Sequence, residues 1–303
     1  SSSLAKIHPP PTVEGMKKLL SLCIALALAA TASADTFIVD SIPGPFTDFE
    51  HVQEAVDSPL VSSGDVLLVR PGIYPRFSSP KGLTILGIGA NPSEVRFTKD
   101  LPDGSPVQLS HSVFLQCNEN GLLGNVQFSD GLQVSQCQGT LRLLEVEADS
   151  FDILNCRDVR VENSGGTMSE EAEVWVANQS NVDFLACNFE RGMNVHNQSR
   201  VRVAQTQIRG EDGDDVQFAF QCCGEGGEPG INMSGGSLVH LVGTSGDIVQ
   251  GGRGGWGWDS ASDGLGGPAI RVAESAARAA IWLAGSIPSL PSRPPISRAS
   301  QPT

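Results

Sequence analysis

The sequence predicts an all-β protein of the parallel β-helix type, a solenoid of coils about 20 residues long. The main observation is a repeat whose copies begin at spacings of 20, 19, 22 and 19 residues. Each copy has a Cys or Asn, a short polar turn and a strand. In that strand apolar residues alternate with polar ones, as in Val159-Arg160-Val161 and Val201-Arg202-Val203. The copies begin at Cys117, Cys137, Cys156, Asn178 and Asn197.

Two segments at the start of the chain are expected to lie outside this fold. Residues 16–34 have a basic start, an apolar run and a small-residue cleavage site near Ala34, which together indicate a secretory signal peptide. Residues 1–15 precede Met16, and we interpret them as a non-native upstream segment. No later apolar run reaches the ~20 residues of a membrane span. We therefore expect a secreted protein, whether extracellular, periplasmic or on the cell surface, with no membrane span.

The charge of the chain excludes one class of partner. Without residues 1–34, which hold three Lys and one Glu, 17 basic side chains (20 − 3) face 33 acidic ones (34 − 1), a net charge of −16. Such a surface repels nucleic acid and anionic membranes and attracts cations. The sequence therefore predicts no nucleic-acid binding.

The region before the repeat predicts a cap for the open end of the solenoid. Residues 47–50 form a capping-box pattern, and Phe49, Val52 and Val56 then lie on one helical face. A buried strand over residues 66–69 follows between two turns. We expect a short N-terminal helix that covers the first coil, because solenoids need protected ends.

The opening of the chain resembles that of a known family. Residues 36–40 read TFIVD, residues 64–74 read GDVLLVRPGIY and residues 81–87 read KGLTILG. This order of edge strand, capping helix and GD-hydrophobic-PG-x-Y coil is similar to the start of secreted bacterial right-handed parallel β-helix proteins of the pectin lyase-like superfamily. The resemblance covers about residues 36–286 and implies a right-handed β-helix domain over residues 35–286. It implies little about activity, because that fold hosts lyases, hydrolases, esterases and non-catalytic surface proteins.

Glycine becomes frequent in the last third of the chain. From about Arg209 the coils are expected to carry long Gly-rich insertions, which we interpret as loops projecting from one side. Residues 287–303 are rich in Pro and Ser with no apolar period, so we expect a disordered tail.

The cysteines of the repeat stand at coil spacing, which predicts a ladder of neighbouring side chains. Cys117, Cys137 and Cys156 are expected to be buried small hydrophobes, disulfides between adjacent coils being one alternative and a metal site another. We expect Asn178 and Asn197 to continue the same column, with their amides hydrogen-bonded along the stack.

The stretch RGEDGDDVQF carries four carboxylates within five residues. One interpretation is a solvated acidic turn. Another is a cation site, for which calcium is the candidate because carboxylate oxygens are its preferred ligands. No other cofactor is indicated. The carboxylates are those of Glu211, Asp212, Asp214 and Asp215.

The same turn resembles the Gly-Asp-Asp step of polygalacturonase-type glycosidases, which share the β-helix fold. The resemblance implies a catalytic pair at Asp214 and Asp215, with His240 in a following coil. The expected third carboxylate and the Arg-x-Lys of that family are missing from this sequence. Catalysis therefore stays an alternative.

Two tryptophans lie in the Gly-rich stretch GGRGGWGWDS. Trp256 and Trp258 could stack on sugar rings, with Arg253 and Asp259 beside them, or fold back to anchor their own loop. We expect a secreted non-catalytic β-helix with a structural or carbohydrate- or surface-binding role. Its expected partner is an extracellular polysaccharide or a cell-surface component. The alternative is a polysaccharide-active enzyme, a glycosidase or a lyase.

Overall fold

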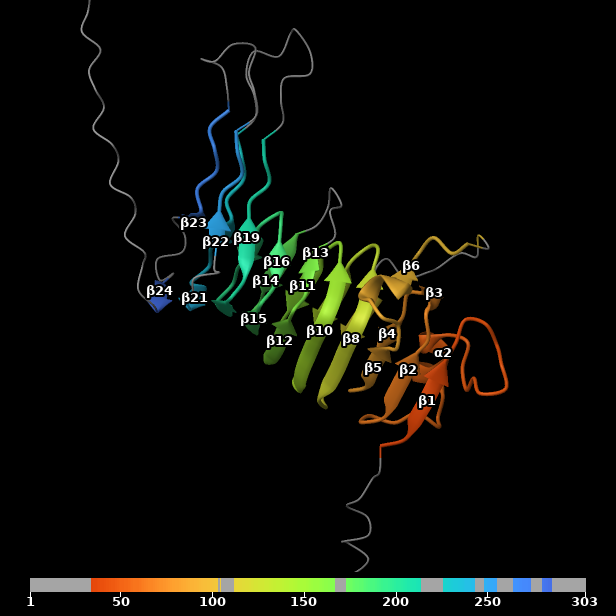
Figure 1. Ribbon diagram of the computed structural model, residues 1–303. Coiled ribbons are helices and arrows are strands. Elements are labelled where there is room, and N and C mark those ends of the chain that lie inside the picture. The colour runs from red at the N-terminus through yellow and green to blue at the C-terminus, as the bar shows by residue number, and fades with distance from the viewer. Residues whose placement is uncertain are drawn as a thin grey trace, which may run out of the picture. The chain divides into compact units, whose positions relative to one another are not determined.

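The computed structural model describes residues 34–102, 104, 112–166, 173–213, 226–242, 248–254, 264–273 and 280–284. The chain divides into two units, Ser1–Asp35 and Thr36–Thr303, and every described helix and strand belongs to the second. These strands form two parallel sheets, one of 16 strands (sheet A) and one of eight (sheet B) (Figure 1). The parallel β-helix predicted from the repeat is confirmed. The predicted signal peptide over residues 16–34 and the predicted tail over residues 287–303 lie outside the described residues, apart from Ala34.

Sheet A contains two strand segments of each regular coil. Its main path runs through ten strands that lie side by side in Figure 1. They are β1 (Thr36–Val39), β2 (Val66–Val69), β5 (Thr84–Gly87), β8 (Gly121–Phe128), β10 (Thr140–Ala148), β12 (Asp158–Glu162), β15 (Asn181–Leu185), β18 (Arg200–Ala204), β21 (Leu238–Val242) and β24 (Ala280–Ala284). The second segments are β3 (Gly72–Pro75), β6 (Val95–Thr98), β13 (Gly165–Gly166), β16 (Asn188–Phe189), β19 (Gln207–Arg209) and β22 (Ile248–Gln250). A short 3₁₀ helix, η1 (Pro92–Glu94), precedes β6.

Sheet B forms the remaining face of each coil. Its strands follow one another in the order of the sequence, every one parallel to the next. They are β4 (Ser78–Ser79), β7 (Ser112–Leu115), β9 (Leu132–Ser135), β11 (Phe151–Leu154), β14 (Val174–Ala177), β17 (Met193–Val195), β20 (Ile231–Met233) and β23 (Ile270–Val272).

The bend between the two segments of sheet A lies at one position per coil. Strands β8 and β10 run through the bend, and there Asn125 and Glu145 have positive φ angles of 53° and 54°. In later coils the bend separates two strands, and Asn163, Ala186 and Gln205 have φ angles of 48°, 55° and 52°. Left-handed backbone at one residue turns the chain sharply without a long loop.

The core follows from strand alternation. Leu143, Val161, Phe184 and Val203 occupy one register position in successive strands, and all four are buried. Burying one such side chain contributes roughly 1.5–3 kcal/mol. The residues one position earlier point outward, which confirms the apolar-in, polar-out alternation read from the sequence. They are Arg142, Arg160, Asp183 and Arg202.

A short helix, α2 (Val52–Asp57), packs on the first coil and buries Val52, Ala55 and Val56. The predicted capping box is wrong in its details. The helix begins after His51, which makes no side-chain cap. The Asp48 carboxylate accepts a hydrogen bond of 2.8 Å from the backbone N–H of Ile38 instead, so it stabilises the edge strand β1.

The cysteine ladder is buried and consists of free thiols. Cys117, Cys137 and Cys156 are each at most 2 % exposed. Their Sγ–H groups donate to backbone carbonyls of their own or the preceding coil, as in the 3.4 Å contact from Cys156 to Val134 O. The structure therefore describes the column as packed thiols without disulfides.

The predicted continuation of this column by asparagines needs a correction. Asn178 and Asn197 are exposed and have left-handed backbone, with φ angles of 60° and 55°. They do form a ladder, since Asn197 Nδ2 donates to Asn178 Oδ1 at 3.0 Å. The buried column is continued by Ser180 and Ser199, both 0 % exposed, because these turns are one residue longer before the inward side chain.

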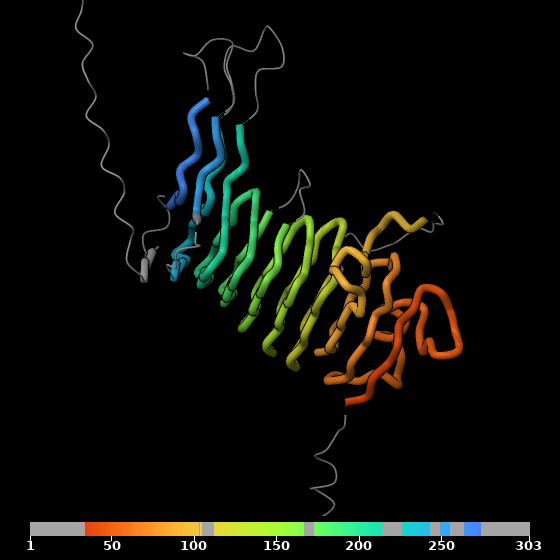
Figure 2. Tube along the Cα trace, in the orientation of Figure 1, coloured from red at the N-terminus to blue at the C-terminus, as the bar shows by residue number. Residues whose placement is uncertain are grey.

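The Gly-rich insertions begin and end with extended backbone runs that hydrogen-bond to one another. Glu228 N–H donates to Glu211 O at 2.8 Å, Gly252 N–H to Glu228 O at 2.9 Å, and a similar bond follows from Gly267 to Gly252. A Cβ atom on Gly252 would lie 1.6 Å from Glu211 O. Glycine is needed here because backbones pack directly on each other. Figure 2 shows these runs side by side in the C-terminal coils.

Candidate functional site

Sheet B presents an outward column of mostly polar side chains. In strands β14 and β17 the residues Val174, Val176, Met193 and Val195 point into the core, so the residues between them face outward. The outward column runs along the register through Gln133, Asp152, Trp175, Asn194, Asn232 and Arg271.

A cavity of about 410 Å³ opens over this column. That volume lies within the range of small-molecule sites. The cavity is built by strands β14, β17 and β20 and by the residues that precede or follow them. It is lined by Glu173, Trp175, Arg191, Met193, Asn194, His196, Glu211, Glu228, Pro229 and Asn232.

Trp175 is the aromatic group of the cavity. It is 37 % exposed, although most large apolar side chains in the described ranges are buried. Its ring packs against that of His196 in a tilted arrangement, with 4.7 Å between ring centroids and 31° between planes. An exposed indole held in one orientation by a neighbouring ring is a surface on which the apolar face of a sugar can pack.

His196 is itself held from the next coil. Its Nδ1 contacts Ser234 Oγ, while its Nε2 is buried and has no hydrogen-bond partner among the described residues. Desolvation lowers the pKa of this imidazole below its ordinary value of 6.5. His196 is therefore a neutral ring at neutral pH, and its structural role is to support Trp175.

Two asparagines and one glutamate form a polar relay across the cavity. Asn232 Nδ2 donates to Asn194 Oδ1 at 3.0 Å, and Asn194 Nδ2 donates in turn to Glu173. The relay fixes the orientation of both amides, so their remaining donors and acceptors are in place before a ligand arrives. Such preorganised polar groups beside an aromatic face are typical of small-molecule sites.

The rim of the cavity is acidic. Desolvation, followed by the charge of Asp152, raises the pKa of Glu173 above its ordinary value, although its hydrogen bond from Asn194 acts in the other direction. Glu211 and Glu228 add to the same increase. Arg191 Nη1 lies 2.6 Å from Glu211 Oε1, so one of the three carboxylates is paired closely.

The described half of the acidic turn contacts arginines. Glu211 pairs with Arg191, whereas Asp212 contacts Arg209 Nη2 at 2.6 and 2.8 Å and accepts a hydrogen bond from Arg253 N–H at 2.6 Å. That backbone hydrogen bond is the largest cause of the lowered pKa of Asp212. Asp214 and Asp215 lie outside the described residues. Within the described ranges, no three His, Cys, Asp or Glu side chains converge on one point that could hold a metal ion.

The remaining predicted site residues are dispersed. His240 lies in β21 on sheet A, in register with Arg202, and is not part of the cavity on sheet B. The predicted sugar-stacking residues Trp256, Trp258 and Asp259 lie outside the described residues, and Arg253 is in the extended run at the start of their loop.

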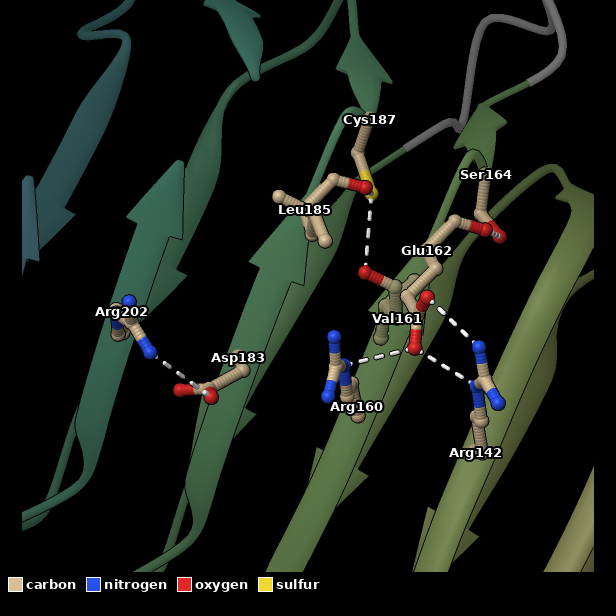
Figure 3. A network of polar contacts seen from close by, with 9 residues as sticks. All are labelled: Arg142, Arg160, Val161, Glu162, Ser164, Asp183, Leu185, Cys187 and Arg202. Atoms are coloured by element: carbon tan, nitrogen blue, oxygen red, sulfur yellow. Dashed lines mark hydrogen bonds and ion pairs between the residues drawn. The ribbon is translucent and has the colours of Figure 1, made fainter. Parts of the chain in front are cut away.

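The charges on sheet A mostly pair with each other. Glu162 lies between two arginines, at 2.7 Å from Arg142 Nε and 2.7 Å from Arg160 Nε (Figure 3). Arg202 and Asp183 form a looser pair at 3.7 Å, also visible in Figure 3. This face is consequently a set of ion pairs that stabilise the stack.

A second hollow of about 760 Å³ lies over the second strand segments of sheet A. Its walls are mostly amides, among them Asn163, Asn188, Gln205 and Gln207, with Gly165 between them. No aromatic side chain lines it, so it lacks the feature that favours the cavity on sheet B.

Trp175, His196 and Glu173 were missed by sequence reasoning. The signal for Trp175 was present, because Val174-Trp175-Val176 has the same alternation as Val159-Arg160-Val161 and so predicts an outward tryptophan. His196 and Glu173 carry no such signal. Whether these two side chains lie in the same cavity depends on the number of residues in each turn between the strands.

Comparison with known protein families, with curated proteins and with solved structures finds no match for this chain. Among the described residues, no helix has the length and apolar character needed to cross a membrane.

Proposed function

We propose that this protein is a secreted, non-catalytic β-helix that binds carbohydrate through the cavity on sheet B. The observation that carries the proposal is Trp175, an exposed indole packed against His196 beside the relay of Asn194, Asn232 and Glu173. A sugar has one apolar face and a rim of hydroxyls. It can pack on the indole while its hydroxyls bond to the amides and the carboxylate.

The other parts of the proposal come from the sequence. The signal-peptide pattern over residues 16–34 supports export, and the opening of the chain supports kinship with the pectin lyase-like superfamily. An exported protein with a sugar site would meet an extracellular polysaccharide or a cell-surface glycan. Calcium stays a candidate ligand of the acidic turn, and an increase in melting temperature on adding calcium would support it.

Glycan-array binding by the full chain tests the proposal. Wild type is expected to bind at least one class of oligosaccharide, Trp175→Ala to lose that signal, and Trp175→Phe to keep part of it because a ring remains. The closest matched control is Trp282→Ala, since Trp282 is in register with His240 on sheet A. Binding that survives in Trp175→Ala would place the site elsewhere.

A polysaccharide-active enzyme is the second candidate, and one observation favours it. Glu173 is a carboxyl group with a raised pKa, and Glu211 and Glu228 line the same cavity. A carboxyl group with a raised pKa near a carboxylate can serve acid–base catalysis. Release of reducing ends or unsaturated sugars from a bound glycan, lost in Glu173→Gln, would favour the enzyme over the binding protein.

A further inference from the structure

We infer that the cavity on sheet B selects an amine-bearing, positively charged glycan, such as a glucosamine oligosaccharide, over neutral and anionic ones. This inference rests on the proposed carbohydrate-binding function and names the ligand class of the same site. It starts from the charge of the cavity wall. Three carboxylates line the cavity, against one arginine.

The single arginine of the lining is already occupied. Arg191 Nη1 lies 2.6 Å from Glu211 Oε1, so this pair contributes little net charge. Glu228 is 3.8 Å from Arg271, and both side chains are about half exposed or more, at 62 % and 49 %. Solvent weakens so loose a pair. The net character of the site is therefore anionic.

Glu173 is the carboxylate best placed to meet an ammonium group. None of the ion pairs in the described ranges includes it, and among the described residues its hydrogen bond comes from the neutral amide of Asn194. It lies two residues before Trp175, whose ring is partly exposed in the same cavity. An ammonium group on a sugar stacked there gains an ion pair with Glu173 and a cation–π contact with the indole.

The same geometry disfavours acidic sugars. A uronate carboxylate in this cavity would lie near Glu173, Glu228 and the neighbouring Asp152, with no free arginine or lysine among the lining residues to receive it. Like charges held close together in a partly desolvated site repel strongly. The mature chain, at −16, adds a long-range field of the same sign.

Calorimetric titration of the full chain with three tetrasaccharides tests the inference. The probes are β-1,4-linked glucosamine, its N-acetylated neutral counterpart and galacturonate, all at pH 7 in EDTA. The glucosamine probe is expected to bind about tenfold more tightly than the neutral one, because one charge-assisted hydrogen bond contributes about that much affinity. Galacturonate is expected to show no binding, and added salt should reduce the preference.

Two variants with the same change in net charge separate a local site from general attraction. Glu173→Gln is expected to bring the glucosamine and neutral probes to within about twofold of each other. Glu145→Gln removes an exposed carboxylate at the bend of sheet A and should leave the tenfold preference intact. An equal effect of both variants would overturn the inference, because the attraction would then belong to the whole acidic surface.

Failure of the inference and failure of the proposed function give different results. If the neutral or the galacturonate probe binds as tightly as glucosamine, and Trp175→Ala abolishes that binding, the carbohydrate site stands and its selectivity for amines is wrong. Galacturonate binding that appears only when calcium replaces EDTA also overturns the inference, in favour of a bridging cation. If none of a broad set of glycans binds, both proposals fall.

Discussion

The ring of Trp175 lies 4.7 Å from that of His196, and the two come from adjacent coils, β14 and the residue after β17. The imidazole is held by Ser234 from the next coil, so three successive coils position one exposed indole. A stack of coils thereby provides a rigid aromatic surface without a loop.

Two replacements of His196 distinguish its packing against the Trp175 ring from hydrogen bonding by its imidazole nitrogens. His196→Phe keeps a ring beside Trp175. It removes a buried nitrogen that has no partner among the described residues, but it also removes the Ser234 contact, so glycan binding should persist and stability should change by less than about 1 kcal/mol. His196→Ala removes the support and should weaken binding about tenfold. Titration calorimetry and urea unfolding of the three proteins provide the comparison. Loss of binding in His196→Phe would instead assign the imidazole a direct contact with the ligand.

The stability of the protein should depend on pH through Glu173. Its pKa in the folded protein is raised from 4.5, so between 4.5 and the raised value the folded state binds more protons than the unfolded state. The free energy of unfolding therefore falls as pH rises through that window. Relative to wild type, Glu173→Gln should become more stable as the pH is raised from 4 to 7. A constant difference between the two proteins would contradict this, and urea unfolding at each pH measures it.

Through His196, the stability of the protein should depend on pH in the opposite direction. Its pKa is lowered from 6.5, so the stability present above 6.5 is lost as pH falls through that value toward the lowered pKa. The double variant Glu173→Gln/His196→Phe should show a flatter pH profile than either single variant.

Two of the buried thiols, those of Cys117 and Cys187, should be unreactive in the folded protein. Burial raises the pKa of Cys187 to about 11, and hydrogen bonding to Cys137 together with burial raises that of Cys117. Thiolate is the reactive form, so at pH 8 a thiol reagent should modify neither residue until the protein is denatured. Peptide mapping after denaturation without reductant should find Cys117, Cys137, Cys156 and Cys187 all modified. Disulfide-linked peptides containing any of them would contradict the free-thiol ladder.

The ion-pair cluster at Glu162 should contribute measurably to stability. Its side chain is only 10 % exposed and forms ion pairs with both Arg142 and Arg160, which are neighbours in register. Glu162→Gln leaves two like charges side by side and should cost about 1–2 kcal/mol in urea unfolding. The exposed pair of Asp183 and Arg202 at 3.7 Å is the control, and Asp183→Asn should cost less than about 0.5 kcal/mol. Equal costs would show that the cluster has no special role.

The close backbone packing at the Gly-rich insertions predicts which glycines can be replaced by alanine. A Cβ on Gly252 would lie 1.6 Å from Glu211 O, whereas on Gly44 it would lie 3.7 Å from Thr47 Oγ1. Gly252→Ala should therefore destabilise the last coils by at least about 2 kcal/mol, and Gly44→Ala should be nearly neutral. Amide hydrogen exchange can locate the loss. Unchanged protection in residues 226–254 of Gly252→Ala would contradict the close backbone packing.

The fold was predictable because a coil repeat and strand alternation are both local patterns. The alternation in Val159-Arg160-Val161 predicts which side chains face inward. The spacing from Cys117 to Cys156 predicts that equivalent side chains of successive coils stack. The buried column is continued by Ser180 and not, as predicted, by Asn178. This could not be predicted from the spacing, because it depends on one extra residue in the turn.

The candidate site was less accessible to sequence reasoning. In the sequence, conspicuous residue types are concentrated in the acidic turn and around the Gly-rich tryptophans. The cavity instead draws Glu173, His196 and Glu228 from three different coils, and only the register of the sheets brings them together. Trp175 was missed as well, although its alternation with two valines carries the signal of an outward side chain.

The most direct test of the account is a crystal structure of the protein with a bound oligosaccharide. The account predicts a sugar ring packed on the indole of Trp175, with hydrogen bonds to Asn194 or Asn232 and an amino group at Glu173. A sugar bound over sheet A, or an empty cavity beside an occupied site elsewhere, would contradict it.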